Sequence, residues 1–104
     1  ATGCAGKTAY PSLSRKKGAA AYYVLEDVFA GGDMDKAEKA IFAYSEREPQ
    51  AYWLAKAFIL LGDVYVRKGD NFQARATYQS VADGYSPADD GIVAEAKERI
   101  AKLN

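Results

Sequence analysis

The chain has no histidine and only one cysteine, Cys4, among its 104 residues. These absences exclude a Ser-His-Asp triad, a Cys-His pair, an intrachain disulfide and a zinc site built from cysteine and histidine. No apolar run approaches the ~20 residues that a membrane span requires. We therefore expect no catalytic residues, no metal site, no cofactor and no membrane span. A single cysteine also leaves the cellular compartment undetermined.

The net charge is zero, but its distribution along the chain is uneven. Residues 1–17 carry four basic and no acidic side chains, whereas residues 18–104 carry ten basic and fourteen acidic ones. A basic segment of this kind can contact nucleic acid or another acidic surface. Gly3, Gly6 and Pro11 interrupt any helical period there, so we interpret residues 1–17 as a flexible, solvated N-terminal segment and expect no nucleic-acid partner.

The first eight residues, ATGCAGKT, fit a permissive phosphate-loop pattern, in which backbone amides, Lys7 and Thr8 would hold a nucleotide and magnesium. A true site of this kind lies between a β-strand and a helix, whereas nothing here predicts a strand and Pro11 follows closely. We therefore expect no nucleotide binding. The same segment resembles the end of a lipoprotein signal with Cys4 as the lipidated residue, but the apolar stretch that precedes such a site is absent, so we expect no signal peptide.

From Ala19 onwards the apolar residues follow a helical period. Gly31-Gly32 and Gly69-Asp70 are expected to end helices, because glycine adopts the left-handed conformation that a helix C-terminus often needs. Asp33 or Asp35 can then cap the second helix. The pattern predicts five helices: residues 19–30, the stretch from this cap to Pro49, residues 51–68, residues 72–85 and residues 92–103, the last capped by Asp89 or Asp90.

The third and fifth predicted helices differ in how their apolar residues are distributed. The third has an apolar stripe and further apolar residues off it, which indicates a central helix buried between neighbours. The fifth has one narrow stripe and is otherwise polar, as expected for a capping helix at the end of a stack. The stripe of the third helix is Leu54, Phe58, Leu61 and Tyr65, with Ile59, Leu60 and Val66 off it; that of the fifth is Ile92, Ala96, Ile100 and Leu103.

The first predicted helix is apolar on two sides. Ala21, Val24, Leu25 and Val28 fall on one face, with Tyr22 and Phe29 beside it. A helix of this kind is expected to be covered on both sides. We therefore predict that the chain either continues a longer array of helices or forms a homodimer through the first helix.

Two stretches of the chain follow one pattern of apolar, small and glycine residues, with their glycine turns 37 residues apart. In the clearer copy, residues 55–87, the matching residues are Phe58, Leu61, Gly62, Tyr65, Gly69-Asp70, Ala74, Tyr78, Val81, Tyr85 and Pro87. In the weaker copy, residues 18–51, they are Val24, Val28, Gly32-Asp33, Ala37, Ile41, Tyr44 and Pro49, with Leu25 where the clearer copy has Gly62. This spacing resembles the tetratricopeptide repeat (TPR), a helix-turn-helix unit of about 34 residues.

The resemblance implies an all-α fold, a TPR-like right-handed α-α superhelix of two helix-turn-helix repeats with a C-terminal capping helix over residues 90–103. It covers residues 18–104 as one domain, and it implies that Gly62 and Ala74 let the two helices of the second repeat approach closely. The repeat is similar in style to those of bacterial cell-envelope proteins and of Bacteroides-type bacteria, so the envelope, the periplasm and the cytoplasm all remain open. A plain helical bundle is the alternative fold.

The resemblance also implies a concave groove lined by the first helix of each repeat. Its residues here would be Tyr22, Glu26, Phe29, Ile59, Asp63, Val66 and Arg67. Ile59 and Asp63 stand where some relatives have the Lys and Asn of a carboxylate clamp, so we do not expect such a clamp. We predict a non-catalytic scaffold that binds an apolar, partly basic protein or peptide segment, with Asp63→Lys weakening binding while hardly affecting stability.

Two other interpretations of the same residues are open. The chain would be a structural spacer or an oligomerisation segment of a longer TPR solenoid if its concave face were polar and unoccupied. The groove residues would alternatively serve only to pack the helices together.

Overall fold

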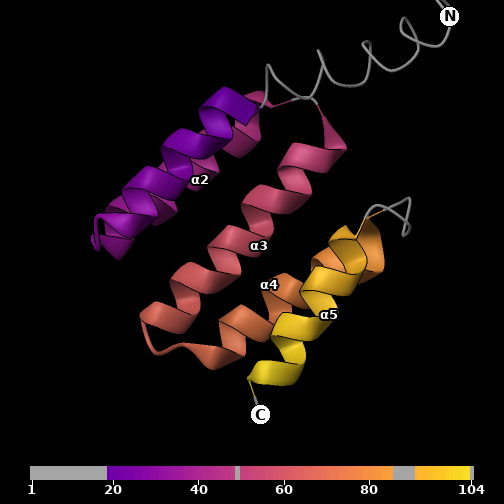
Figure 1. The fold of residues 1–104 in the computed structure, drawn as a ribbon. Coiled ribbons are helices and arrows are strands. Elements are labelled where there is room, and N and C mark those ends of the chain that lie inside the picture. Colours follow the sequence, from indigo (N-terminus) through magenta and orange to yellow (C-terminus); the bar gives the residue numbers. More distant parts are fainter. Residues whose placement is uncertain (1–18, 49, 86–90, 104) are drawn as a thin grey trace, which may run out of the picture.

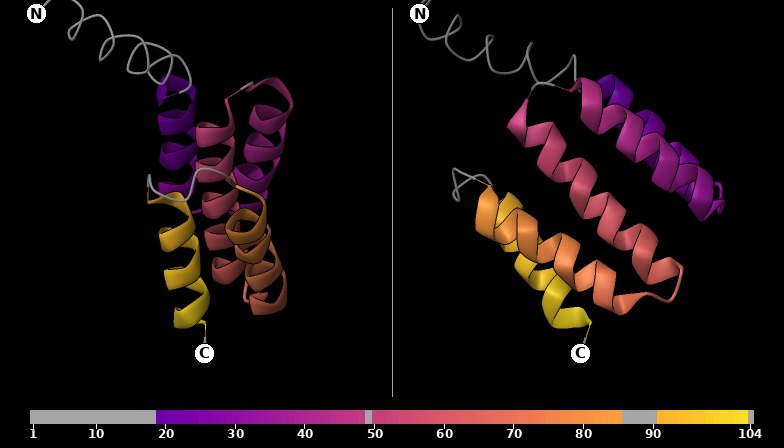
Figure 2. Two further views of the ribbon diagram at one scale, coloured as in Figure 1. Left: turned by 90° about the vertical axis from the view of Figure 1, so that its right-hand side faces the viewer. Right: turned by 180° about the vertical axis from the view of Figure 1, so that it is seen from behind.

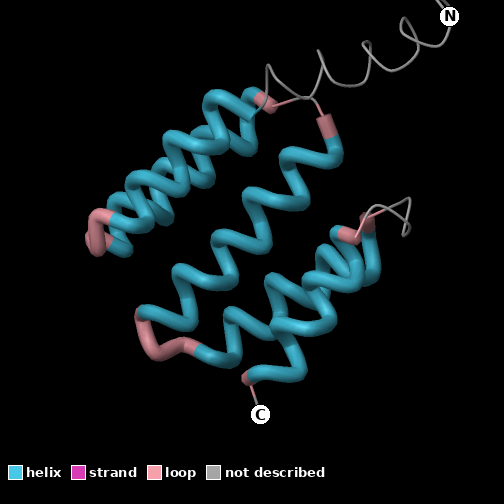
Figure 3. The backbone as a smooth tube through the Cα atoms, viewed as in Figure 1, coloured by secondary structure: helices cyan, strands magenta, loops and turns pink. Residues whose placement is uncertain are grey.

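The computed structural model describes residues 19–48, 50–85 and 91–103, and this part of the chain is helical apart from short loops (Figures 1 and 3). It contains five helices and no strand, which confirms the all-α prediction. The helices are the first helix at residues 19–30, α2 at Met34–Arg47, α3 at Ala51–Arg67, α4 at Asn71–Gly84 and α5 at Ile92–Lys102. Predictions for residues 1–17 and for Pro49 and Pro87 lie outside the described residues.

Helix α3 is the centre of the arrangement, as its two-sided apolar pattern predicts. It packs against α2, α4 and α5, and α5 also packs against α4. The first helix and α5 lie on one side of α3, and α2 and α4 lie on the other (Figure 2, left). The first helix, α3 and α5 can therefore form one common surface.

Two similar turns connect the helices within each pair. Gly32 and Gly69 have positive φ angles of 93° and 83°, which only glycine adopts without strain. Asp33 and Asp70 follow them as N-caps: each carboxylate accepts a hydrogen bond from the backbone N–H three residues on, at 3.1 Å and 3.0 Å. The predicted glycine turns and the Asp33 cap are confirmed.

The start of α5 differs from the prediction. Its N-cap is Gly91, with a φ of 90° and no side-chain cap. Asp89 and Asp90, the predicted caps, lie outside the described residues. The chain turns into α5 through a left-handed conformation that glycine adopts without strain.

Helices α3 and α4 pack closely at Gly62 of α3. A Cβ atom built on this glycine would lie 2.3 Å from the Cε1 atom of Tyr78 in α4, so no other residue fits without displacing the ring. Tyr78 and Ala74 are almost completely buried. The predicted tight packing at Gly62 is confirmed, and the side chain that requires it is Tyr78.

The first helix is rotated relative to the orientation that its sequence suggests. Tyr22 and Leu25 are buried, whereas Ala21 and Val24 are exposed. Leu25 and Val28 of the predicted face thus pack in or against the core, whereas Ala21 and Val24 of that face are turned outward. Tyr22 packs instead against Trp53 of α3, with ring centroids 5.3 Å apart.

Polar contacts attach α2 to the far end of α3. The Tyr65 hydroxyl donates a hydrogen bond of 2.9 Å to Glu38. The ammonium group of Lys68 lies 2.7 Å from Asp35 and 3.0 Å from Glu38. One cation thus holds two carboxylates of the neighbouring helix.

Candidate binding cleft

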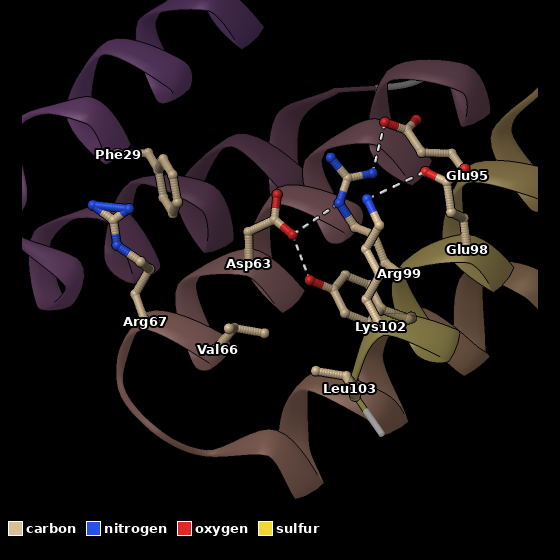
Figure 4. A pocket seen from close by; sticks show the side chains of 10 residues that line it. Phe29, Asp63, Val66, Arg67, Glu95, Glu98, Arg99, Lys102 and Leu103 are labelled. Atoms are coloured by element: carbon tan, nitrogen blue, oxygen red, sulfur yellow. Dashed lines mark hydrogen bonds and ion pairs between the residues drawn. The ribbon is translucent and has the colours of Figure 1, made fainter.

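The common surface of the first helix, α3 and α5 contains an open cleft of about 350 Å³ (Figure 4). The side chains that we use to define it come from all three helices. They are Phe29 of the first helix, Asp63, Val66 and Arg67 of α3, and Glu95, Glu98, Arg99, Lys102 and Leu103 of α5 and its C-cap. Tyr78 of α4 also lines the cleft.

A carboxylate lies at the centre of the cleft and is held by its neighbours. Asp63 accepts a hydrogen bond from the Tyr78 hydroxyl and lies 3.0 Å from Nε of Arg99 (Figure 4). Nη1 of Arg99 also lies 2.7 Å from Glu95, so one guanidinium joins two carboxylates. These contacts fix α5 against α3 and form one wall of the cleft.

Burial raises the pKa of the Asp63 carboxyl above its ordinary 3.8, and the hydrogen bond from Tyr78 and the charge of Arg99 offset only part of this effect. Burial and the neighbouring Asp63 also raise the pKa of the Tyr78 hydroxyl, which keeps it protonated as a hydrogen-bond donor. The shared Arg99 leaves Asp63 and Glu95 with one cation between them. The carboxylate of Asp63 therefore already forms an ion pair within the protein.

The opposite side of the cleft carries an accessible cation. The guanidinium of Arg67 lies 5.0 Å from the centroid of the Phe29 ring, and Val66 beside it is 39% exposed (Figure 4). Among the described residues, Arg67 forms no ion pair. Lys102 of α5 also lines the cleft and forms an ion pair with Glu98, at 3.6 Å.

The structure brings together four of the seven groove residues predicted from the sequence: Phe29, Asp63, Val66 and Arg67 line the cleft. Tyr22 and Ile59 are 5% and 3% exposed and belong to the core. Glu26 is exposed on the first helix but does not line the cleft. Asp63, which was predicted to meet a cation of the partner, already has two partners within the protein, Arg99 and Tyr78.

The contribution of α5 was not predicted from the sequence. The pairs Glu95–Arg99 and Glu98–Lys102 were recognisable by their four-residue spacing and form at 2.7 Å and 3.6 Å. Nothing in that spacing shows that Arg99 also reaches Asp63, since this depends on how α5 packs against α3. The one usable signal was the apolar stripe of α5, which required a packed position next to α4.

The described part of the chain contains no group of three or more histidine, cysteine or acidic residues that could hold a metal ion. None of the helices that the structure describes combines the length and the apolar character needed for a bilayer crossing. Comparisons with protein-family models, with curated proteins and with solved structures each find no match.

Proposed function

We propose that this protein is a non-catalytic protein-binding module, which holds a segment of a partner in the cleft. We further propose that its helices form a TPR-like right-handed superhelix, with two helix-turn-helix repeats and α5 as the capping helix. Two observations support the repeat: the Gly-Asp turns at Gly32 and Gly69, and the close packing at Gly62 where the TPR pattern has a small residue.

The observation that carries the proposal is the environment of Arg67. This side chain lies over Phe29, is exposed to solvent and has no ion-pair partner in the described part of the chain. A planar guanidinium held over an aromatic ring offers a fork of donors that suits a carboxylate. Stacking also reduces the side-chain freedom that Arg67 would lose on binding.

Apolar surface lies next to this cation. Phe29 and Leu103 are partly exposed, and Val66 is exposed between them. A partner segment that places an apolar side chain here and a carboxylate on Arg67 would use both features. The sequence predicts a partly basic partner; we propose a carboxylate-bearing one instead, because Asp63 is already ion-paired with Arg99 within the protein whereas Arg67 is not paired in the described residues.

Selection of a peptide from a displayed random library by the immobilised protein provides the test. We expect the selected peptides to combine an apolar residue with Asp or Glu. Arg67→Glu should weaken the binding of such a peptide by about tenfold or more, measured by fluorescence anisotropy, since two acidic groups would then meet. Arg47→Glu is the matched control, because Arg47 is also an exposed arginine in the last turn of a helix but lies outside the cleft.

A structural spacer makes the opposite prediction. If Arg67→Glu and Arg47→Glu bind the selected peptide as the parent does, the cleft is not the binding surface. If selection enriches no peptide at all, the binding function itself is contradicted and the spacer is the better account.

A further inference from the structure

The outward side of the first helix presents apolar side chains to solvent. Tyr23 and Val24 are 56% and 58% exposed, and Ala20 and Asp27 on the same side are exposed as well. These four residues, which we call the outer face, follow the spacing of one side of a helix. Two adjacent large apolar residues this exposed at one place are unusual for a surface that remains in water.

The equivalent face of α3 is buried. Aligning Gly32 with Gly69 superimposes the outer face on Ala57, Leu60, Leu61 and Val64 of α3, all of which are buried. Helix α3 packs against α2, α4 and α5. The outer face therefore has the position of a packed helix surface. Within the described residues the Tyr23 ring contacts Tyr22 and Trp53 edge-on, with centroids 5.8 Å and 6.3 Å apart, but Tyr23 and Val24 remain more than half exposed.

A hollow of about 330 Å³ adjoins the outer face and carries charges of both signs. It is lined by Val24, Asp27, Val28, Gly31, Asp33 and Lys36. Within the described part of the chain, Lys36 forms no ion pair. Asp27 forms none there either, so an acid and a base next to an apolar patch both remain available.

We propose that a second copy of this chain docks on the outer face in a two-fold symmetric dimer. In such a contact the same surface meets itself, so Tyr23 and Val24 would pack against their counterparts. A two-fold axis through the hollow would bring Asp27 of each copy to Lys36 of the other. The outer face and the adjoining hollow are thus self-complementary in both apolar character and charge.

The other end of the helical stack fits the outer face less well. The exposed side of α5 presents Lys97, Glu98 and Lys102. A head-to-tail contact would bury Lys97 without a described partner and the Glu98–Lys102 ion pair against Tyr23 and Val24, which is costly. The symmetric contact avoids this cost and also closes the assembly at two copies.

Sedimentation velocity of the full chain over a range of concentrations tests this inference. We expect a dimer that Val24→Glu converts to a monomer with unchanged helical circular dichroism. Phe72→Glu is the matched control, because Phe72 is 83% exposed but lies on α4. It should remain dimeric.

A charge exchange adds a second, independent test. Asp27→Lys should raise the dimer Kd about tenfold, because like charges then face each other across the axis. Adding Lys36→Asp should restore most of the affinity. If the double variant dimerises as weakly as Asp27→Lys alone, the proposed geometry is contradicted.

A full chain that is monomeric at every concentration overturns the proposal. Nitration of Tyr23 then distinguishes the causes: protection would indicate that residues 1–18 cover the face, and reaction would indicate that it stays open. A dimer that Val24→Glu leaves intact overturns the proposal as well, since the contact must then lie elsewhere. The cleft and its peptide are not involved in either measurement.

Discussion

Arg99 of α5 places its Nε atom 3.0 Å from the carboxylate of Asp63 in α3, and this contact joins the last helix to the central one. Both side chains are partly buried, with 30% and 24% of their surface exposed. The Tyr78 hydroxyl donates to the same carboxylate, so three helices meet at Asp63. Asp63 therefore holds α5 in the position that shapes the cleft. Its charge interacts with Arg99 and is not a free charge in the cleft.

Asp63→Lys is expected to lower the free energy of unfolding by ~1–3 kcal/mol, because it removes both acceptor contacts and places two cations together. Urea unfolding at neutral pH measures this change in the free energy of unfolding. Glu98→Lys serves as the control, since Glu98 is mostly exposed, and should change stability by no more than ~0.5 kcal/mol. Equal stability of Asp63→Lys and the parent would show that the Asp63–Arg99 contact does not hold α5 in place.

Gly62→Ala is expected to destabilise the protein by ~1–3 kcal/mol, because the added methyl group would overlap the Tyr78 ring. This loss should exceed the ~1 kcal/mol that alanine gains over glycine within a helix. Gly84→Ala is the matched control: Gly84 lies at the end of α4, and its Cβ would meet nothing within 4 Å. Thermal or urea unfolding should show opposite signs for the two variants, and two stabilised variants would contradict the packing at Gly62.

The agreement between sequence and structure is closest where local chemistry decides the outcome. The glycine turns, the Asp33 cap and the position of α3 follow from backbone conformation and apolar spacing alone. The small residue at Gly62 could also be recognised from the repeat pattern. None of these features depends on the angle at which two helices meet.

The features that the sequence does not reveal depend on the angle at which two helices meet. Leu25 faces the core as predicted, but Val24 of the same face is exposed, and Tyr22 from beside that face is buried against Trp53. Apolar residues on both sides of the helix made the two rotations indistinguishable from the sequence. The contact between Asp63 and Arg99 likewise joins residues 36 positions apart, which no local pattern reveals.

The acid dependence of stability should change in Lys68→Met. The hydrogen bond from Lys68 is the first cause that lowers the pKa of Asp35 below its ordinary 3.8 and that of Glu38 below its ordinary 4.5. Carboxyl groups with a lowered pKa in the folded state stabilise it above their ordinary pKa, and this stabilisation is lost as the pH falls through the lowered values.

Measuring Tm for the parent and for Lys68→Met at neutral pH and below both ordinary pKa values tests this. The difference between the two proteins should be largest at neutral pH and should shrink in acid and in high salt. Lys97→Met, at an exposed lysine of α5 with no ion pair in the described part of the chain, should show no such trend. A pH-independent Tm difference for Lys68→Met would mean that Lys68 does not hold these carboxylates.

Phe29→Ala should weaken binding of a selected peptide by about tenfold, because it removes both apolar contact area and the ring that supports Arg67. Phe72→Ala is the control, since it removes an exposed phenylalanine outside the cleft. Fluorescence anisotropy compares the two. Equal loss in both variants would point to a general effect on the protein, and no loss in Phe29→Ala would remove the aromatic side of the cleft from the binding surface.

The most direct test of the proposed function is a chemical-shift titration of the isotope-labelled full chain with a peptide selected on it. We expect the perturbed amide and side-chain signals to cluster on the last turns of the first helix and α3 and on the facing side of α5, at Phe29, Val66, Arg67 and Lys102. Perturbations centred on Tyr23 and Val24, or on α2 and α4, would show that partners bind another surface and would contradict the assignment of the cleft.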